Sequence, residues 1–283
     1  MVLVIGIPRK IKIQSIEISL HIILMLGALA MIMPFLWMIT TSLKPLNRVF
    51  AYPPEWLPRY FEWGNYLAAL RGAPFERFYL NTIIIAVTVT FSQLVLCSMA
   101  AYAFARLRFH GRDILFMIVL STMMIPGQVT LIPSFLVVKH LNWLDTYYAL
   151  IVPDMVGAFG IFLLRQFLIS LPVDLEDAAR IDGCSRFMIL WRILLPLIKP
   201  ALSTLAVFNF MWSWNAFLWP LIVTNKTTMR TIQVGLSIFR SRYGIQWTYL
   251  MAGTVIATLP VLVVFLFGQK QFIRGITLTG FKG

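Results

Sequence analysis

The sequence predicts an all-α, polytopic membrane protein, and three observations lead to this class. Hydrophobic residues make up 59% of the 283 residues and charged residues only 12%, about half of the roughly 25% typical of soluble domains. The apolar runs are long and continuous, close to the roughly 20 residues that a helix needs to cross the hydrocarbon core. Only helices or closed barrels satisfy the backbone in lipid, and these runs are too long for barrel strands.

Six apolar stretches predict six transmembrane helices in a single domain, residues 1–283. An even number of spans places both termini on one side of the membrane. Segments on that side carry basic residues, including Arg9, Lys10, Arg106 and Lys282, and the positive-inside rule assigns this side to the cytoplasm. We therefore expect a multi-pass protein with both termini in the cytoplasm. The predicted spans are 18–41, 80–104, 114–138, 147–168, 193–223 and 249–272.

Prolines interrupt the third and fourth predicted spans. Pro126 and Pro133 lie in the third span, and Pro153 lies in the fourth. Proline lacks a backbone N–H and bends or breaks a helix, and broken helices often line the sites of transporters. We therefore expect bent helices here, with Pro126, Gly127 and Gln128 forming part of an outer gate.

A polar loop between the fourth and fifth predicted spans carries helix signals. We expect Asp174 to cap a short helix through Asp182, with Glu176 in the first turn, where the helix dipole favours negative charge. Gly183 is expected to end this helix. Ser185 is expected to cap a second helix that runs directly into the fifth span. The pattern predicts a short helix, a sharp turn and a second helix joined to a transmembrane element.

One face of the predicted fifth span carries amide and indole side chains. Asn209, Trp212, Asn215 and Trp219 recur every three or four residues, which places them on one side of a helix. Amide hydrogen bonds and aromatic stacking suit a sugar in a solute path. Helix packing, in which asparagine links neighbouring spans, is the alternative interpretation, and the sequence leaves both open.

Several function classes find no support in the sequence. The net charge of +13 comes from basic residues scattered at helix ends, so anionic lipid headgroups are sufficient partners and nucleic acid is not expected. Cys97, Cys184 and the three histidines are dispersed, which predicts neither a disulfide nor a metal site. The sequence contains no phosphate-binding loop and no recognisable nucleophile turn, so we expect no catalytic residue and no cofactor in this chain.

The polar loop resembles the EAA loop of ABC importer permeases. That pattern has a glutamate, two alanines, an Asp-Gly pair and a distal Leu-Pro pair, and here Asp177 replaces its first alanine. The residues that match are Glu176, Ala178, Ala179, Asp182, Gly183, Ile193, Leu195 and Pro196.

Further segments resemble the carbohydrate-uptake branch of these permeases, to which the smaller maltose permease subunit belongs. Ala216 departs from the acidic residue that often follows Trp-Asn in that branch. The matching segments are Ala101 to Leu107 with Phe109 and Gly111, Phe162 to Phe167, Trp214-Asn215 with Pro220-Leu221, and Gly275 to Gly283.

The resemblance implies a type I ABC importer permease fold in the inner membrane of a bacterium or archaeon. It implies a second, different permease subunit, an ABC ATPase dimer that binds ATP and Mg, and an extracytoplasmic solute-binding protein. Loop 172–192 would couple to the ATPase through contacts of Glu176 and Asp182, with Gly183 shaping the turn. The tail, Gly280 to Gly283, would dock on the ATPases. The implied solute is a carbohydrate, with a glycerol phosphate as the alternative.

Two other classes, a secondary transporter and a membrane-embedded enzyme, are less compatible with the sequence than a permease of this kind. A secondary transporter needs buried ionisable groups for ion coupling, and the middle of the predicted spans has almost none. A membrane-embedded enzyme needs a reactive constellation of side chains, which the sequence does not offer. The non-catalytic permease subunit is therefore the predicted class.

Overall fold

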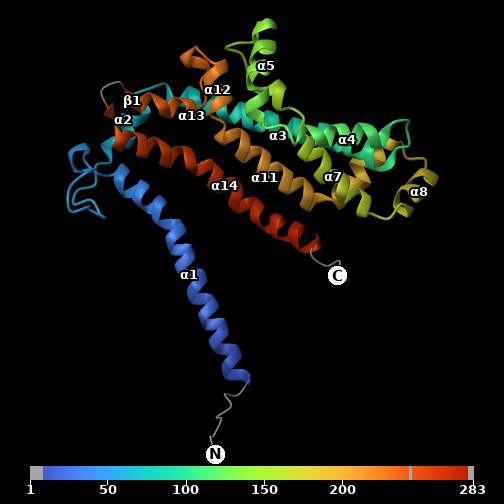
Figure 1. Cartoon of the computed structure of the whole chain (residues 1–283), viewed down its shortest axis with the longest axis horizontal. Coiled ribbons are helices and arrows are strands. Elements are labelled where there is room, and N and C mark those ends of the chain that lie inside the picture. Colours follow the sequence, from blue (N-terminus) through green and yellow to red (C-terminus); the bar gives the residue numbers. More distant parts are fainter. Residues whose placement is uncertain (1–8, 242–243, 280–283) are drawn as a thin grey trace, which may run out of the picture. The chain divides into compact units, whose positions relative to one another are not determined.

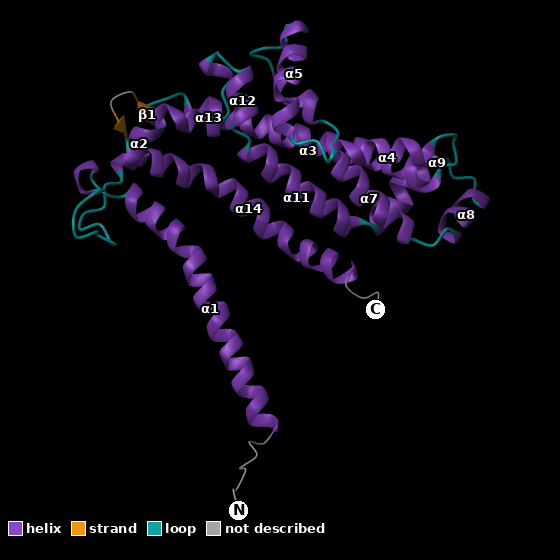
Figure 2. Ribbon diagram, viewed as in Figure 1, coloured by secondary structure: helices purple, strands orange, loops and turns teal. Residues whose placement is uncertain are grey.

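The computed structural model of the chain describes residues 9–241 and 244–279, and the tail Gly280 to Gly283, with its expected docking role, lies outside them. Helices dominate the described residues (Figure 2), as the predicted all-α class requires. The strands in this part are a two-residue antiparallel pair, in which Arg240 pairs with Ile245 and Ser241 pairs with Gly244.

The elements carry the labels of Figure 1. In chain order they are α1 (Arg9–Ser42), a 3-10 helix (Leu46–Arg48), α2 (Gly64–Arg71), α3 (Phe75–Arg106), α4 (Arg112–Thr122), α5 (Gly127–His140), α6 (Tyr147–Ile151), a 3-10 helix (Val152–Asp154), α7 (Ala158–Ser170), α8 (Asp174–Ile181), α9 (Arg186–Met188), a π-helix (Ile189–Leu194), α10 (Leu195–Leu197), α11 (Lys199–Asn215), α12 (Leu218–Val223), a 3-10 helix (Thr227–Met229), α13 (Ile232–Leu236), a 3-10 helix (Ser237–Phe239), β1 (Arg240–Ser241), β2 (Gly244–Ile245) and α14 (Trp247–Thr279).

The chain divides into two compact units. The first comprises the chain up to Ala69 together with Phe239–Ile256, and the second comprises Leu70–Ile238 together with the chain from Ala257 onward. Both candidate site regions described below belong to the second unit.

In the first unit, polar contacts join the end of α1 to the start of α2. The Asn65 amide donates to the backbone carbonyls of Ser42 and Lys44, both at 2.9 Å, and so satisfies carbonyls that a helix end leaves without partners. The Lys44 ammonium lies 4.1 Å from the centroid of the Trp37 ring. Burial lowers the pKa of Lys44, and the nearby Glu55 carboxylate acts in the opposite direction.

In the second unit, α3 is the central helix. It packs against α7 and α11, which lie beside it in Figure 1. Gly160 of α7 allows this close approach, because a Cβ added there would lie 2.9 Å from the Cys97 sulfur and 3.2 Å from Leu205 Cδ1. Small residues have this role wherever helix backbones approach closely in membrane proteins.

Buried apolar clusters contribute to the core of the described part of the second unit, and two of them connect several helices. The larger one joins α3, α4, α7 and α11 to α8 and the π-helix, and the smaller one joins α3 to α5, α6 and α12. The largest fully buried side chains of the first cluster are Leu164, Leu168, Ile189, Leu194, Ile198 and Leu205.

The described helices have the length and composition of membrane spans. Four of them are long and apolar enough to cross a membrane, and two further helix pairs pass the same test together but are bent, by 99° and 84°. The number of candidate spans is therefore four, or up to six if each bent pair is one span. The four candidates that pass the test singly are Glu17–Ser42, Phe75–Arg106, Tyr147–Ser170 and Trp247–Gln269.

The first bent pair confirms that proline interrupts the predicted third span. α4 ends at Thr122, α5 begins at Gly127, and the two are bent by 99°. Pro126 lies at the junction, immediately before α5. Proline has no N–H and disfavours helical conformation in the residue before it, so α4 ends before Pro126 is reached.

The predicted fifth span, 193–223, is broken twice in the structure. The helical segments on either side of Ile198 are bent by 84°, so the second helix of the polar loop does not run directly into the span, contrary to expectation. Pro200 lies in the first turn of α11, where proline is favoured, and a new helix therefore begins there. α11 ends because Ala216 is extended, with ψ 124°.

Candidate functional site

The polar loop forms a short helix, α8, in which the expected cap is displaced by one residue. Asp174 is the first residue of α8, and the N-cap is Val173, whose carbonyl accepts the Glu176 N–H at 2.8 Å. Asp174 as N-cap was therefore wrong, because Val173 already has helical backbone angles. Asp174, Glu176 and Asp177 still lie in the first turn, where the helix dipole favours negative charge.

Gly183 ends α8 as predicted. Its φ is +79°, its N–H donates to the Arg180 carbonyl at 3.0 Å, and the Cys184 N–H donates to the Ala179 carbonyl at 2.9 Å. These two bonds form a Schellman motif. A Cβ added at Gly183 would meet no atom within 4 Å, so the left-handed conformation, and not crowding, requires glycine.

The second helix of the loop begins at the residue that the sequence indicates. The Ser185 hydroxyl accepts the Met188 N–H at 3.3 Å and so caps the helical segment that starts at Arg186. The segment between the two helices consists of Gly183, Cys184 and Ser185 alone once the C-cap Asp182 is counted with α8. The predicted sharp turn is therefore confirmed.

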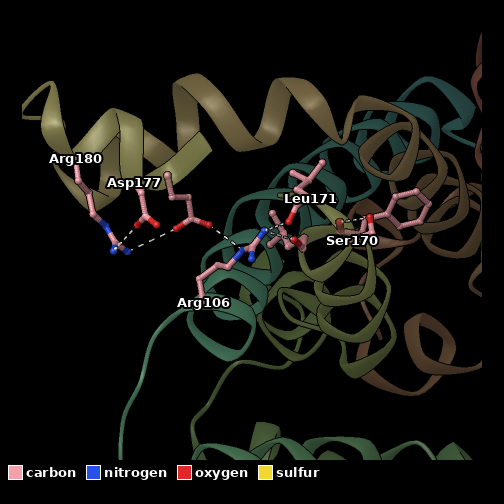
Figure 3. Close-up of polar contacts among 8 residues, drawn as sticks. Arg106, Ser170, Leu171, Asp177 and Arg180 are labelled. Atoms are coloured by element: carbon pink, nitrogen blue, oxygen red, sulfur yellow. Dashed lines mark hydrogen bonds and ion pairs between the residues drawn. The ribbon is translucent and has the colours of Figure 1, made fainter. Parts of the chain in front are cut away.

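Arg106, the last residue of α3, ties three helices together (Figure 3). Its Nη2 donates to the carbonyls of Leu168 and Leu171, at 2.7 and 2.6 Å, and so satisfies carbonyls at the end of α7. Its Nε lies 2.8 Å from Oε1 of Glu176 in α8. The side chains are only 9% and 1% exposed, respectively. A single guanidinium thus links the ends of α3 and α7 to α8.

The contact between Arg106 and Glu176 is an ion pair and not an aligned hydrogen bond, since neither Nε nor Oε1 has a hydrogen-bond partner in the described part of the chain. Arg180 adds a weaker contact to the other carboxylate oxygen, at 3.8 Å, and one to Asp177 at 3.4 Å. Arg180 is 47% exposed, so solvent screens these contacts.

Glu176 has a structural role within the chain. Its side chain is 1% exposed and pairs with Arg106, and its expected contact with an ATPase stays a prediction. Ala179 is also buried, in the larger apolar cluster. Ala178 and Asp182 are exposed. Of the predicted coupling residues, two therefore anchor α8, two face outward, and Gly183 forms the turn.

The exposed side of the loop is partly apolar. Ile181 is 87% exposed and Phe187 is 62% exposed, and Asp182 lies beside Ile181 in the chain. Ile181 and Phe187 were not among the predicted coupling residues, although a large apolar residue at the exposed end of a charged helix is a recognisable signal for a contact surface.

On α11, the predicted amide and indole face divides into bonded and open side chains. Asn209 donates to the Gln93 side chain of α3 at 3.1 Å, and Gln93 donates to the backbone carbonyl of Asp154 at 2.9 Å. Trp219 of α12 donates its indole N–H to the Ala149 carbonyl at 2.8 Å. Asn209 and Trp219 therefore link helices, as the packing interpretation expects.

The other two members of the face are open. Trp212 is 77% exposed. Asn215 is also exposed; it donates to the Met211 carbonyl of its own helix at 2.8 Å and accepts from Gln233 at 3.4 Å. These two side chains leave surface available for contacts outside the chain.

Two cavities of the second unit bring the predicted gate and path together. One, of about 460 Å³, is lined by the gate residues Gly127 and Gln128 and by Trp212 and Trp219. The other, of about 510 Å³, is lined by Gln93, Asn209 and Trp212. Pro126 comes immediately before Gly127 in the chain and is not among the residues that line these two cavities. Asn215 and Trp212 line a third, smaller cavity of about 380 Å³.

Sequence reasoning missed three residues that the structure brings into these regions. Arg106 was predicted only as a basic residue beside a span and as part of the matching segment Ala101 to Leu107, and no role was predicted for Gln93. Asp154 was not predicted to line a cavity, and it lines both cavities from within the candidate span Tyr147–Ser170. The available signal was chemical: amides and ionisable groups within an apolar span are costly and indicate function.

Comparison with known proteins defines the class. The family described as "Binding-protein-dependent transport system inner membrane component" matches residues 93–278, and the chain belongs to this family. It is thus the membrane component of an ABC transporter, in agreement with the resemblance of the polar loop to the EAA pattern.

Individual relatives are similar over almost the whole chain. The arabinooligosaccharides transport system permease protein AraQ of Bacillus subtilis (strain 168) is 36% identical, covering 94% of this chain and 96% of the relative. The sn-glycerol-3-phosphate transport system permease protein UgpE of Yersinia pestis bv. Antiqua (strain Antiqua) is 32% identical, with 93% and 96% covered.

A solved structure supports the fold. It is the crystal structure of a bacterial ABC transporter involved in the import of the acidic polysaccharide alginate, and it matches with a TM-score of 0.82 and 26% identity, covering 94% of this chain and 99% of the matched chain. The predicted type I importer permease fold and the carbohydrate-uptake resemblance are therefore confirmed.

Proposed function

We propose that this chain is one of two permease subunits of an ATP-driven importer for a carbohydrate that an extracytoplasmic solute-binding protein delivers. ATP and Mg are bound by a dimer of partner ATPases. The chain lies in the cytoplasmic (inner) membrane with both termini in the cytoplasm. The names of the arabinooligosaccharide and alginate proteins support a saccharide, and the similarity to the glycerol phosphate permease keeps that solute as the second candidate.

The observation that carries this proposal is the anchoring of α8 by the buried pair of Arg106 and Glu176. Motion of a partner reaches the membrane helices only if the element it touches is held firmly by them. Arg106 belongs to α3, the central helix of the unit, and its Nε lies 2.8 Å from Glu176 Oε1. Removing one partner of a buried ion pair leaves an uncompensated charge, so the pair resists separation.

The outward side of the loop supplies the surface for the ATPase. Ala178 is small, Asp182 is charged and Ile181 is 87% exposed, so a partner cleft could close over the end of α8 without displacing the buried side. We propose that closure of the ATPase dimer around ATP moves α8, and that Arg106 and the apolar cluster pass this motion to α3 and α7. ATP hydrolysis in the partner then resets the permeases.

At the other end of the unit, we propose that Trp212 and Asn215 face the solute, while Asn209 and Trp219 hold the path in shape. The gate would consist of Pro126, Gly127 and Gln128. These residues lie where the helix is broken between α4 and α5, so the segment can change conformation without unfolding a continuous helix. The lining of one cavity by Gln128 and Trp212 together supports this assignment.

The proposal is tested by co-purification of the whole transporter. Ile181→Glu places a charge on the exposed end of α8 and is expected to reduce recovery of the ATPase with the permease about tenfold or more, since burying an unpaired charge in an interface costs several kcal/mol. Leu141→Glu is the matched control, because Leu141 is 45% exposed but lies at the C-cap of α5.

Two results would sink the proposal. If no ATPase is recovered when the unaltered chain is purified together with the other proposed subunits, the proposed partner is wrong. Equal recovery with Ile181→Glu and with Leu141→Glu would show that α8 is not the docking element.

A further inference from the structure

We infer that the two cavities on either side of Asp154 form a subsite for an uncharged, hydroxyl-rich saccharide, and that the Asp154 carboxylate excludes anionic solutes from it. This inference rests on the proposed function and names its substrate class. It concerns a choice that the relatives leave open, since their names include arabinooligosaccharides, glycerol phosphate and an acidic polysaccharide.

Asp154 and Trp212 connect the two cavities. Both residues line the cavity of about 460 Å³ and the cavity of about 510 Å³. Asp154 ends the short 3-10 helix Val152–Asp154 before α7, and its backbone carbonyl is held by Gln93 at 2.9 Å. This bond fixes the backbone at Asp154, and Asp154 as a whole is exposed.

The charge that lines the two cavities is negative only. Among the described residues that line these two cavities, Asp154 is the single charged residue, and none of them is lysine, arginine or histidine. No hydrogen bond or ion pair holds its carboxylate within the described ranges, 9–241 and 244–279. A phosphate or uronate entering here would meet a like charge with no basic side chain in the lining to offset it, and like charges repel.

The same lining suits the hydroxyls of a neutral sugar. An ionised carboxylate only accepts hydrogen bonds, and hydroxyl groups donate to it in charge-assisted bonds that are stronger than neutral ones. Amides of Gln93, Gln128 and Asn209 add donors and acceptors around it. The indole of Trp212, 77% exposed, offers a flat apolar surface for the C–H face of a sugar ring.

Transport by the complete reconstituted importer tests the specificity. The probes are a neutral arabinose trisaccharide, sn-glycerol 3-phosphate and a guluronate trisaccharide. Each probe is supplied at the same concentration, together with the solute-binding protein, on the extracytoplasmic side of the reconstituted importer. We expect uptake of the neutral trisaccharide alone. Asp154→Asn keeps the shape and removes the charge, and it is expected to raise the KM for the neutral probe about tenfold, because a charge-assisted bond becomes a neutral one.

A second measurement reports the electrostatics of the cavity without any substrate or binding protein. In a Cys184→Ser background, Trp212→Cys is modified with a cationic and with an anionic methanethiosulfonate reagent. We expect the cationic reagent to react about tenfold faster than the anionic one, and Asp154→Asn to remove this preference. Asp113→Asn, an equal change of charge at a side chain that is 71% exposed beside Arg112, is the matched control and is expected to leave the preference intact.

The outcomes separate the inference from the proposed function. If no saccharide of any kind is imported, the proposed function fails. If the anionic probes are imported as well as the neutral one and Asp154→Asn does not change the reagent preference, the importer stands and the inference is overturned.

Discussion

The two ends of the second unit hold their carboxylates in opposite ways. At the coupling end, Glu176 is 1% exposed and paired with Arg106 at 2.8 Å. At the cavity end, Asp154 is exposed and lines two cavities beside Trp212. A buried, paired charge fixes the geometry of the elements that carry it, whereas an open charge is available to a ligand. The buried pair anchors α8, and we propose that the cavities beside Asp154 receive the solute.

The largest effect is expected at the buried pair. Arg106→Ala leaves the Glu176 carboxylate buried without its partner and removes the donors to the ends of α7. We expect the free energy of unfolding to fall by about 3–5 kcal/mol, measured as a lower midpoint of thermal unfolding of the purified transporter. An unchanged midpoint would show that the pair does not anchor α8.

Arg180→Ala is the control for that variant, because it removes an arginine that touches the same carboxylate at 3.8 Å but is 47% exposed. An exposed pair of this kind contributes about 0–1 kcal/mol, so the midpoint should scarcely move. Equal shifts of the midpoint in the two arginine variants would show that the buried contact of Glu176 with Arg106 contributes no more stability than its exposed contact with Arg180.

A smaller effect is expected at the turn after α8. Gly183→Ala places a side chain at φ +79°, and the left-handed conformation costs a non-glycine residue roughly 1–2 kcal/mol. We expect a modest loss of stability and a larger loss of uptake, because the turn sets the direction of α8. Gly27→Ala, within α1 and with no atom within 4 Å of the added Cβ, should instead stabilise its helix by about 0.5–1 kcal/mol.

The smallest effect on stability, and a clear one on transport, is expected at the cavities. Trp212→Ala removes a side chain that is 77% exposed, so the free energy of unfolding should change by no more than about 0.5 kcal/mol. Uptake of a neutral saccharide should fall while recovery of the ATPase stays constant. A large loss of stability here would mean that Trp212 belongs to the core and not to the solute path.

The sequence predicted the local features of the coupling loop because their causes are local. Glycine at a left-handed position and serine before a helix specify their own backbone geometry, and the structure confirms both Gly183 and Ser185. The pairing of Arg106 with Glu176 could not be predicted in this way, since it depends on how α3 and α8 pack. The basic residue was visible only as part of a charge pattern at a span end.

The membrane helices show the same division. Proline predicted the break before α5, because the missing N–H acts on its own helix. It did not predict the 84° bend at Ile198, since prolines in a first turn are also compatible with a continuous helix. The bond between Asn209 and Gln93 joins α11 to α3, and only tertiary packing decides whether an asparagine on a helix face meets such a partner or remains open like Trp212.

The most direct test of the coupling proposal is a double-mutant cycle on Arg106→Gln and Glu176→Gln, read as solute imported per ATP hydrolysed by the complete reconstituted transporter. If the pair transmits motion from the ATPase, each single variant should retain ATP hydrolysis but lower the ratio, and the double variant should lose no more than the worse single one. Ratios that stay at the unaltered value in the single variants, or losses that simply multiply in the double variant, would contradict it.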